Sequence, residues 1–315
     1  MIKVQFINTI FTALIFCFAT VPSASQNSVI AIAKQWGEFG DKPGQFKYPA
    51  MLAADKSSNI YVVDQHNHRI QKFDSEGNFL LKWGKQGNGE GEFNFPYGIA
   101  INSKGDVFVS DMNNNRIQKF SSDGKFVAST GSYGAADGQL KYPYGVAVDE
   151  NDVLYVIDAF NYRIQKFDSD LKFLSKWGSQ ESIGFKLYMP HELAFSKDGN
   201  IIMSDRQNHR LSFFTKDGDL IKRIGEYGEG MDSGGKQFSE PHGVAVDEFG
   251  YFYILDRYNF RIHKFSPSGE FLVQGNTSGV FDDSKHFPLG VTTGKDGFIY
   301  VTDNYAHCIQ KYNSR

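Results

Sequence analysis

Six segments of the chain each carry a proline followed by a residue whose type changes from segment to segment. That residue is in turn Ala50, Tyr97, Tyr144, His191, His242 and Leu289. An aspartate follows in each segment, and the two positions after it also vary: Gln65-His66, Met112-Asn113, Ala159-Phe160, Arg206-Gln207, Arg257-Tyr258 and Asn304-Tyr305. Histidine, arginine and tyrosine side chains can bind anions, donate hydrogen bonds and stack on flat ligands.

These variable positions fall into two groups. An aromatic group comes from the second and third segments: Tyr97, Tyr144 and Phe160. A cationic, hydrogen-bonding group comes from the fourth and fifth segments, and Tyr305 of the last segment adds a further candidate: His191, Arg206, His242, Arg257, Tyr258 and Tyr305. If the fold brings them together, they predict a site for a small anionic or aromatic ligand, or for a protein or peptide segment of that character. The alternative is a surface lined by polar side chains and water alone.

The elements that must position these residues repeat along the chain. The aspartates open six related stretches: DQHNHRIQKF, DMNNNRIQKF, DAFNYRIQKF, DRQNHRLSFF, DRYNFRIHKF and DNYAHCIQKY. Successive aspartates lie 47, 47, 47, 51 and 47 residues apart, and a proline-led apolar run such as FPYGIAIN precedes each one. A period of about 40–50 residues with several short strands per unit is typical of the blades of a β-propeller.

The second unit shows the expected strands most clearly. Short β-branched and aromatic runs, YGIAI, DVFVS, RIQKF and KFVAST, are separated by the turn or loop sequences SKG, DMNNN and SSDG. Such runs bounded by Gly, Asp, Asn and Ser predict strands joined by hairpins, and no long window has helical periodicity. Four strands in six units predict an all-β fold, a six-bladed β-propeller over residues 29–315.

The closure of the ring can also be predicted. The last unit ends after its third strand, HCIQKYNSR, whereas the stretch VIAIAKQWGEFG near the N-terminus resembles a fourth strand. Its register agrees, because Trp36 lies 13 residues before Pro49, as Trp83 does before Pro96. We therefore expect the N-terminal strand to complete the last blade and to remove two open sheet edges.

The repeated polar positions are predicted to be structural. Each lead aspartate is expected to accept backbone N–H groups of the loop that follows it. It is also expected to pair with the arginine that opens the next strand: Arg69, Arg116, Arg163, Arg210 and Arg261. Cys308 takes the arginine position in the last unit. A ring of identical pairs does not form a single active site.

The stretches Asp-x-x-Asn-x-Arg-Ile-Gln-Lys-Phe, with Pro-x-Gly-Val-Ala-Val ahead of them, resemble NHL repeats. This resemblance covers essentially all of residues 29–315 and implies a six-bladed propeller. NHL propellers serve as ligand-binding, protein-binding and sensor modules. One branch is a zinc-dependent lyase that acts on C-terminal hydroxyglycine peptides.

The lyase branch places histidines directly after the proline that opens a strand, as His191 and His242 are placed here. The resemblance implies that these two would be zinc ligands, with Arg206 and either Tyr258 or Tyr305 in catalysis. A third ligand would have to be His66 or His286, which lie outside the matching position. We therefore expect a binding or interaction module without a cofactor, and we assign no catalytic residue. The alternative is a zinc-dependent lyase or hydrolase.

Composition and the N-terminus narrow the function further. The 315 residues carry 33 Lys and Arg against 36 Asp and Glu, a net charge of −3, which argues against nucleic-acid binding. Residues 1–25, with Lys3 before an apolar run and Ser23–Ser25 after it, predict a secretory signal peptide. An uncleaved anchor is the alternative. We expect a secreted or periplasmic monomer that leaves the membrane once the leader is cleaved.

Overall fold

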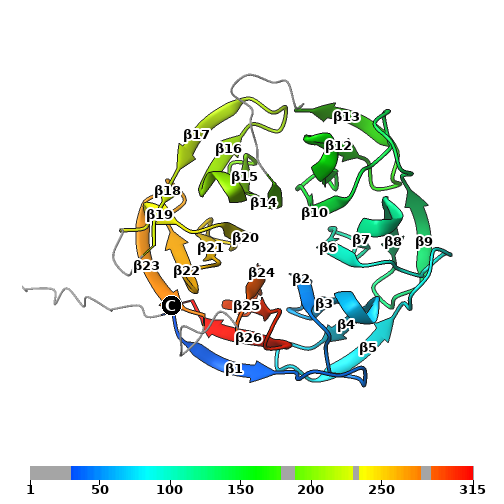
Figure 1. Cartoon of the computed structure of the whole chain (residues 1–315), viewed down its shortest axis with the longest axis horizontal. Coiled ribbons are helices and arrows are strands. Elements are labelled where there is room, and N and C mark those ends of the chain that lie inside the picture. Colours follow the sequence, from blue (N-terminus) through cyan, green and yellow to red (C-terminus); the bar gives the residue numbers. More distant parts are fainter. Residues whose placement is uncertain (1–29, 179–188, 230–233, 278–284, 315) are drawn as a thin grey trace, which may run out of the picture.

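The computed structural model describes residues 30–178, 189–229, 234–277 and 285–314. In this part of the chain the strands form six four-stranded antiparallel sheets, arranged around a central axis (Figure 1). The predicted all-β, six-bladed propeller is confirmed. The leader predicted over residues 1–25 lies outside the described residues. Among the described residues no helix is long and apolar enough to cross a membrane.

Consecutive strands pair within each blade, and the first strand of each blade lies nearest the axis (Figure 1). Blade one contains β2 (Pro49–Ala54), β3 (Ile60–Asp64), β4 (Arg69–Phe73) and β5 (Phe79–Trp83). Blade two contains β6 (Pro96–Ile101), β7 (Val107–Asp111), β8 (Arg116–Phe120) and β9 (Phe126–Thr130). Blade three contains β10 (Pro143–Val148), β11 (Leu154–Asp158), β12 (Arg163–Phe167) and β13 (Phe173–Trp177).

The remaining blades follow the same order. Blade four contains β14 (Pro190–Phe195), β15 (Ile201–Asp205), β16 (Arg210–Phe214) and β17 (Leu220–Ile224). Blade five contains β20 (Pro241–Val246), β21 (Phe252–Asp256), β22 (Arg261–Phe265) and β23 (Phe271–Asn276). Blade six contains β24 (Pro288–Thr293), β25 (Phe298–Asp303), β26 (Cys308–Asn313) and β1 (Ile32–Trp36). The short strands β18 (Glu226–Tyr227) and β19 (Gln237–Phe238) pair between blades four and five.

The loops after the second strands are short. In the first four blades they form single 3-10 turns: η1 (Gln65–Asn67), η2 (Met112–Asn114), η3 (Ala159–Asn161) and η4 (Arg206–Asn208). Each turn ends at a residue in the left-handed region, for example His68 at φ 52°. This geometry reverses the chain within a few residues, so the variable positions after each aspartate stay beside the start of the blade's first strand.

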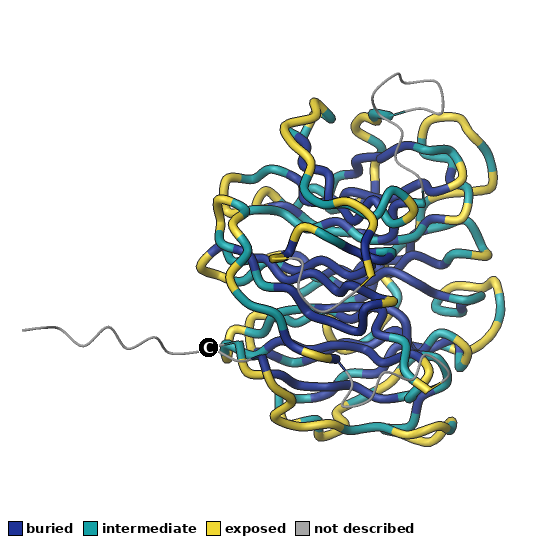
Figure 2. The backbone as a smooth tube through the Cα atoms, turned by 60° about the vertical axis from the view of Figure 1, so that its left-hand side comes forward, coloured by how far each residue is buried: buried dark blue, intermediate teal, exposed yellow. Residues whose placement is uncertain are grey.

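The core is divided among the blade junctions. Six clusters of buried apolar side chains form, each built mainly from two neighbouring blades. The second strand of each blade supplies much of this core; β11, for example, is buried along its whole length. The fourth strands are the most exposed, so buried backbone lies inside and exposed backbone at the edge and in the turns (Figure 2). Burial of apolar surface between blades therefore holds the ring together.

The N-terminal strand closes the ring as predicted. β1 pairs antiparallel with β26, with Trp36 opposite Ile309. The Trp36 indole then packs on the turn between β4 and β5 of blade one, where a Cβ added to Gly77 would lie 2.7 Å from the ring. Gly77 also has φ +78°, so this turn requires glycine twice over. β1 therefore completes the sheet of blade six, and its Trp36 side chain contacts blade one.

The repeated aspartates are structural, but the expected backbone donor from the following loop is found in blade six, whereas in blades one, two, three and five the donor precedes the first strand. In blade three the Asp158 carboxylate accepts hydrogen bonds from Asn161 Nδ2 (2.9 Å), Arg163 Nε (2.7 Å) and Gln165 Nε2 (3.0 Å). Its backbone donor is Lys141 N at 2.7 Å, which precedes the first strand instead of following the second. The aspartate therefore ties the entry into its blade to the blade's middle strands.

Blade six satisfies its aspartate in a different way. Cys308 lies opposite Asp303 where the other blades have arginine, and His286 Nδ1 lies 2.7 Å from the Asp303 carboxylate instead. Phe287 N and Ala306 N also donate to it, at 2.8 and 3.1 Å. Cys308 is buried, and this burial raises the pKa of its thiol. A buried, protonated thiol is a poor nucleophile.

Candidate functional site

The start of each first strand and the loop after each second strand meet at one end of the central channel. Antiparallel pairing causes this: Pro96 lies opposite Asp111 in blade two, and Pro190 opposite Asp205 in blade four. The variable positions therefore gather at one end of the central axis, as the sequence predicted. We call this end of the channel the mouth and define it by residues that contact one another there: Tyr97, Tyr144, His191, Arg206, Glu240, His242 and Arg257.

His191 is the centre of the mouth. Its Nδ1 lies 2.8 Å from the Tyr97 hydroxyl, which is contributed by blade two, and its Nε2 lies 3.0 Å from Arg206 Nη1. The Tyr144 ring packs against it with centroids 4.9 Å apart, and the His242 ring follows at 4.1 Å. The predicted aromatic and cationic groups thus meet in one cluster instead of lying on separate sides.

The partners of His191 determine its tautomer. A guanidinium can only donate, so His191 Nε2 must accept from Arg206 and the ring is neutral. The remaining proton is then on Nδ1, which donates to the Tyr97 oxygen. Burial and the two nearby arginines lower the pKa of His191 well below its ordinary value, in agreement with a neutral ring. The Tyr97 hydroxyl proton is consequently available to another acceptor.

A single carboxylate lies between the two arginines of the mouth. Glu240 Oε2 accepts from Arg206 Nε at 2.6 Å and from Arg257 Nη1 at 3.0 Å. Arg206 and Arg257 carry two positive charges against the one negative charge of Glu240. Burial and then Arg206 lower the pKa of Arg257, so its charge is costly in this position. One positive charge in the mouth has no counter-ion among these residues.

Within the part of the chain that the structure describes, two buried polar atoms of the mouth have no hydrogen-bond partner: His242 Nδ1 and Arg257 Nε. His242 is only 1% exposed. Burial, and then His191 and the arginines, lower its pKa well below the ordinary value, so the ring is neutral. Buried polar groups are nearly always paired, and those left unpaired cost about 1–3 kcal/mol each. The pair indicates a place where a ligand can supply the missing partner.

The three other predicted site residues lie further out. Phe160, Tyr258 and Tyr305 are 41%, 45% and 43% exposed. Phe160 contacts Tyr144 edge-on at 6.4 Å, and the Arg257 guanidinium lies 4.4 Å from the centre of the Tyr258 ring. The ring of Tyr305 packs on Phe287, with centroids 4.8 Å apart. They surround the buried cluster with exposed aromatic surface.

Glu240 is the residue of the mouth that our sequence reasoning missed. It occupies the position directly before the proline, where the six segments read Tyr48, Phe95, Tyr142, Met189, Glu240 and Phe287. One carboxylate among aromatic and apolar residues was a visible break in the repeat. Its backbone has φ 51°, as at Tyr48 and Phe95, so the scaffold conformation is retained and only the side chain differs.

The residues present do not form a zinc site of the kind that the lyase alternative requires. In the part of the chain that the structure describes, no group of three or more His, Cys, Asp or Glu side chains could hold a metal ion. His286 is hydrogen-bonded to Asp303, and the His66 ring lies between Tyr48 and Phe95. The Nε2 lone pair of His191 is occupied by Arg206. A catalytic zinc needs three protein ligands.

The channel below the mouth is lined by the backbone and the mostly small aliphatic side chains of the first strands. A cavity of about 270 Å³ follows the first strands of the blades and is lined by residues such as Ala53, Val148 and Ala194. Glu192 is the acidic residue in its lining, and Val244 N donates to it at 2.9 Å. Burial raises the pKa of Glu192 well above its ordinary value, which favours the neutral acid.

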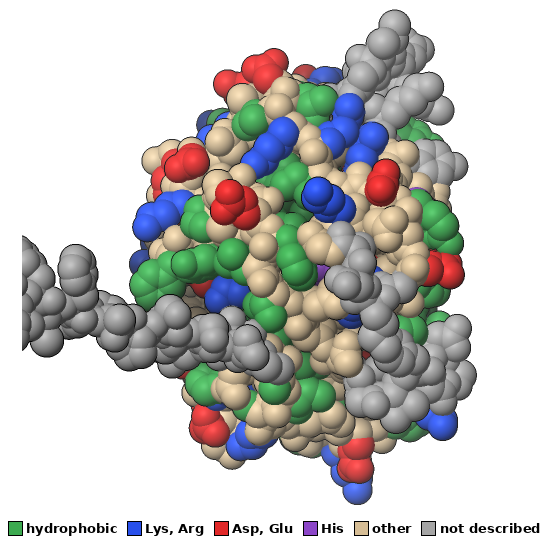
Figure 3. Space-filling view, turned by 90° about the vertical axis from the view of Figure 1, so that its left-hand side faces the viewer, with side chains coloured by type: hydrophobic (Ala, Val, Ile, Leu, Met, Phe, Trp, Pro, Cys, Tyr) green, Lys and Arg blue, Asp and Glu red, His purple; other side chains and the backbone are tan. Residues whose placement is uncertain are grey.

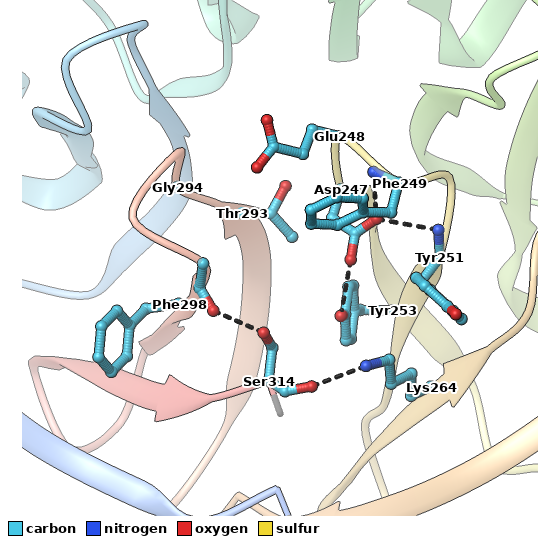
Figure 4. Close-up of a pocket in the computed structure, with 11 residues that line it drawn as sticks. Asp247, Glu248, Phe249, Tyr251, Tyr253, Lys264, Thr293, Gly294, Phe298 and Ser314 are labelled. Atoms are coloured by element: carbon cyan, nitrogen blue, oxygen red, sulfur yellow. Dashed lines mark hydrogen bonds between the residues drawn. The ribbon is translucent and has the colours of Figure 1, made fainter.

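A second cavity, of about 150 Å³, lies at the opposite end of blades five and six, where the first strands finish (Figure 4). Its polar groups are already paired: Tyr253 donates to Asp247 at 3.0 Å, and Lys264 donates to the Ser314 carbonyl at 2.7 Å (Figure 4). No residue predicted for the site lies there. These hydrogen bonds stabilise the fold, and the paired groups are not available to contact a ligand.

The longer connection between blades four and five ends beside the mouth. The spacing of 51 residues between Asp205 and Asp256, against 47 elsewhere, indicates a four-residue insertion in residues 225–241, which by sequence would be either a partial lid over the cationic group or a tolerated surface insertion. Residues 230–233 lie outside the described residues, whereas β18 and β19 pair and lead directly to Glu240.

On the side of the molecule that carries blade five, acidic and basic side chains are interspersed with hydrophobic ones (Figure 3).

Comparison with known proteins agrees with this architecture. The NHL repeat profile matches residues 46–73, 93–120, 238–265 and 286–312, which are the first three strands of blades one, two, five and six. A solved structure described as a streptogramin B lyase superposes with a TM-score of 0.61, covering 89% of this chain and 96% of that one at 15% identity. At this identity the likeness concerns the fold alone.

Two sequence relatives match over short stretches. The "Protein brain tumor" of Drosophila melanogaster is 49% identical over 45 residues, which is 14% of this chain and 4% of that protein. The probable peptidyl-alpha-hydroxyglycine alpha-amidating lyase pgal-1 of Caenorhabditis elegans is 29% identical over 99 residues, 30% of this chain and 27% of that protein. The chain therefore matches well under a third of either relative's length. It is a six-bladed β-propeller that contains NHL repeats.

Proposed function

We propose that this protein is a binding module whose channel mouth takes a ligand with an anionic group. The observation that carries the proposal is the uncompensated charge: Arg206 and Arg257 share one oxygen of Glu240. An anion would balance this charge in surroundings where burial has removed water. Arg257 Nε, which has no partner among the described residues, would be available to donate to it.

The test is a titration of the protein with acetate and inorganic phosphate at constant ionic strength, followed by ligand-observed NMR. Arg206→Gln and Arg257→Gln each remove one charge from the mouth and should weaken binding. Lys82→Gln is the matched control, because it removes one charge from the exposed face of β5, and it should bind as the parent does. Equal affinity of all four proteins, or no binding of either anion, would refute the proposal.

The zinc-dependent lyase is the alternative, and the partial match to the amidating lyase favours it, whereas His191 and His242, whose ring centroids lie 4.1 Å apart, have no third ligand among the described residues. It predicts about one equivalent of zinc after mild loading, measured by elemental mass spectrometry, and loss of that metal in His191→Ala and His242→Ala. Absence of bound metal in the parent protein would leave the binding module.

We further propose that the protein is exported as a monomer. The basis is the predicted leader of residues 1–25 and a remaining chain with one cysteine, Cys308, whose thiol is buried. Mass spectrometry of the protein isolated from its own cells tests the leader, because cleavage near Ser23–Ser25 gives a shortened N-terminus. A full-length protein in the membrane fraction would contradict export by cleavage, and light scattering would detect an oligomer.

A further inference from the structure

We propose that a pocket beside the mouth binds the aromatic ring of an arylalkanoate, a ligand in which a carboxylate is joined to an aromatic ring by a short alkyl chain. This inference rests on the proposed function of the mouth and names the class of ligand. The pocket lies between blades five and six, has a volume of about 220 Å³ and is lined by Arg257, Tyr258, Phe260, His286, Phe287 and Tyr305. We call it the side pocket.

The three aromatic walls of the side pocket come from three positions of the repeat. Two of these positions are the second residue after the lead aspartate, one in each of the two neighbouring blades. The third is the residue directly before the proline that opens the later blade. Between blades five and six all three are carbocyclic aromatic residues: Tyr258, Tyr305 and Phe287. At the other junctions at least one of the three is histidine, asparagine, glutamine, methionine or glutamate. The aromatic walls are therefore a departure from the repeat and not a part of the scaffold.

The walls are arranged to receive a flat group. The Phe287 and Tyr305 rings are inclined by 31°, with centroids 4.8 Å apart, and Tyr258 and Tyr305 are each nearly half exposed. Phe260 is buried at 7% exposure. A cavity of about 150 Å³ can hold a benzene ring, so the side pocket has sufficient volume. Offset and edge-to-face contacts with the tyrosine and phenylalanine rings would favour an aromatic ring over an alkyl group.

Arg257 joins the side pocket to the mouth. The central carbon of its guanidinium lies 3.7 Å from the centre of the Phe287 ring and 4.4 Å from that of Tyr258, so the cation contacts both aromatic rings. The edge of the same group reaches Glu240 in the mouth through Nη1, and its Nε has no partner. A carboxylate bound at this edge would place a ring attached by a short alkyl chain next to the aromatic walls. His286 is held by Asp303 and does not compete for the carboxylate.

The experiment compares three carboxylates by ligand-observed NMR titration of the full chain: acetate, 3-phenylpropionate and 3-cyclohexylpropionate. We expect 3-phenylpropionate to bind roughly tenfold more tightly than acetate, and about threefold more tightly than its cyclohexyl analogue. Tyr305→Ala should lower the affinity for 3-phenylpropionate to that for acetate. Tyr133→Ala is the matched control, because Tyr133 is a 63% exposed tyrosine at another blade junction, and it should retain the preference.

The results separate this inference from the proposed function. Suppose that acetate binds and that Arg257→Gln weakens this binding. If 3-phenylpropionate then binds no more tightly than 3-cyclohexylpropionate, or no more tightly than acetate, the side-pocket assignment is wrong and the anion site stands. If no carboxylate binds, the side-pocket assignment is wrong, and if phosphate also fails to bind, the proposed function is wrong as well. N-acetylphenylalanine distinguishes two sources of the same chemistry: tighter binding than 3-phenylpropionate identifies the C-terminal residue of a peptide, and weaker binding identifies a free acid.

Discussion

The ring of repeated aspartates and the mouth of the channel lie at the same end of the propeller, yet they differ in how far their charged groups are neutralised by neighbouring residues. Asp158 is buried and surrounded by four hydrogen-bond donors, one of them the arginine that neutralises it. In the mouth, two arginines share one carboxylate oxygen, and His242 and Arg257 each keep an unpartnered buried nitrogen. At Asp158, where the repeat is kept, the carboxylate is fully satisfied within the chain. In the mouth, where the repeat is broken, two buried nitrogens are not.

Removal of one repeated aspartate should have the largest effect on this comparison. Asp158→Ala leaves Arg163 and its neighbouring donors buried without their anion, and breaking such a pair costs about 3–5 kcal/mol. We expect the free energy of unfolding to fall by that amount in chemical denaturation. Asp170→Ala, which removes a carboxylate that is 89% exposed, should change it by less than about 0.5 kcal/mol. A small loss for Asp158→Ala would show that the pair contributes little to the scaffold.

Substitution of one arginine in each region should separate stability from binding. Arg257→Gln should reduce the affinity for acetate about tenfold, because a charge-assisted hydrogen bond of roughly 1.5 kcal/mol is lost, while stability changes little. Arg163→Gln should do the reverse: it should lower the free energy of unfolding and leave the affinity intact. Isothermal titration and chemical denaturation of both variants provide the measurements. The distinction fails if either variant changes both quantities to the same degree.

Acidification should act on the mouth through its histidines. Their pKa values are lowered below the ordinary value of 6.5 in the folded protein, so the unfolded chain binds more protons below that pH. Stability should therefore fall as the pH decreases below about 6.5, with each such group contributing up to about 1.4 kcal/mol per pH unit. The melting temperatures of the parent, His191→Gln and His242→Gln at pH 7.5 and 5.5 test this. The variants should lose less stability than the parent on acidification, and identical losses would contradict a neutral, buried histidine pair.

Removal of the internal carboxylate of the mouth should have the smallest effect and the opposite sign. Glu240→Gln takes away the anion that already occupies the arginines, so the affinity for acetate should rise about threefold. Glu226→Gln is the control, because it removes an exposed carboxylate from the same connection between blades four and five. Both variants are compared with the parent in the same NMR titration. A lower affinity in Glu240→Gln would mean that Glu240 positions the arginines more than it competes with ligands.

The sequence alone determined the scaffold and the end of the channel at which the candidate site lies. Hydrogen bonding in a propeller blade links consecutive strands, so the spacing of Asp64, Asp111 and Asp158 was enough to predict the blades. The spacing of Trp36 from Pro49 predicted the closing strand in the same way. Antiparallel pairing then places the residue after each proline beside the loop after each aspartate. This is why His191 and Arg206, far from Tyr97 in the chain, could be assigned to one opening.

The chemistry of the mouth was decided only by tertiary structure. The bond between Tyr97 and His191 joins residues 94 positions apart in non-adjacent blades, and Glu240 reaches Arg206 across 34 positions. The tautomer of His191, the uncompensated charge and the side pocket around Arg257 all depend on such contacts across the ring. Local spacing specifies most of the backbone pairing, because apart from the closing pair β1 and β26 the strands pair with their neighbours in sequence. It does not specify which side chains meet in the channel, because that depends on the rotamers and burial that all six blades impose together.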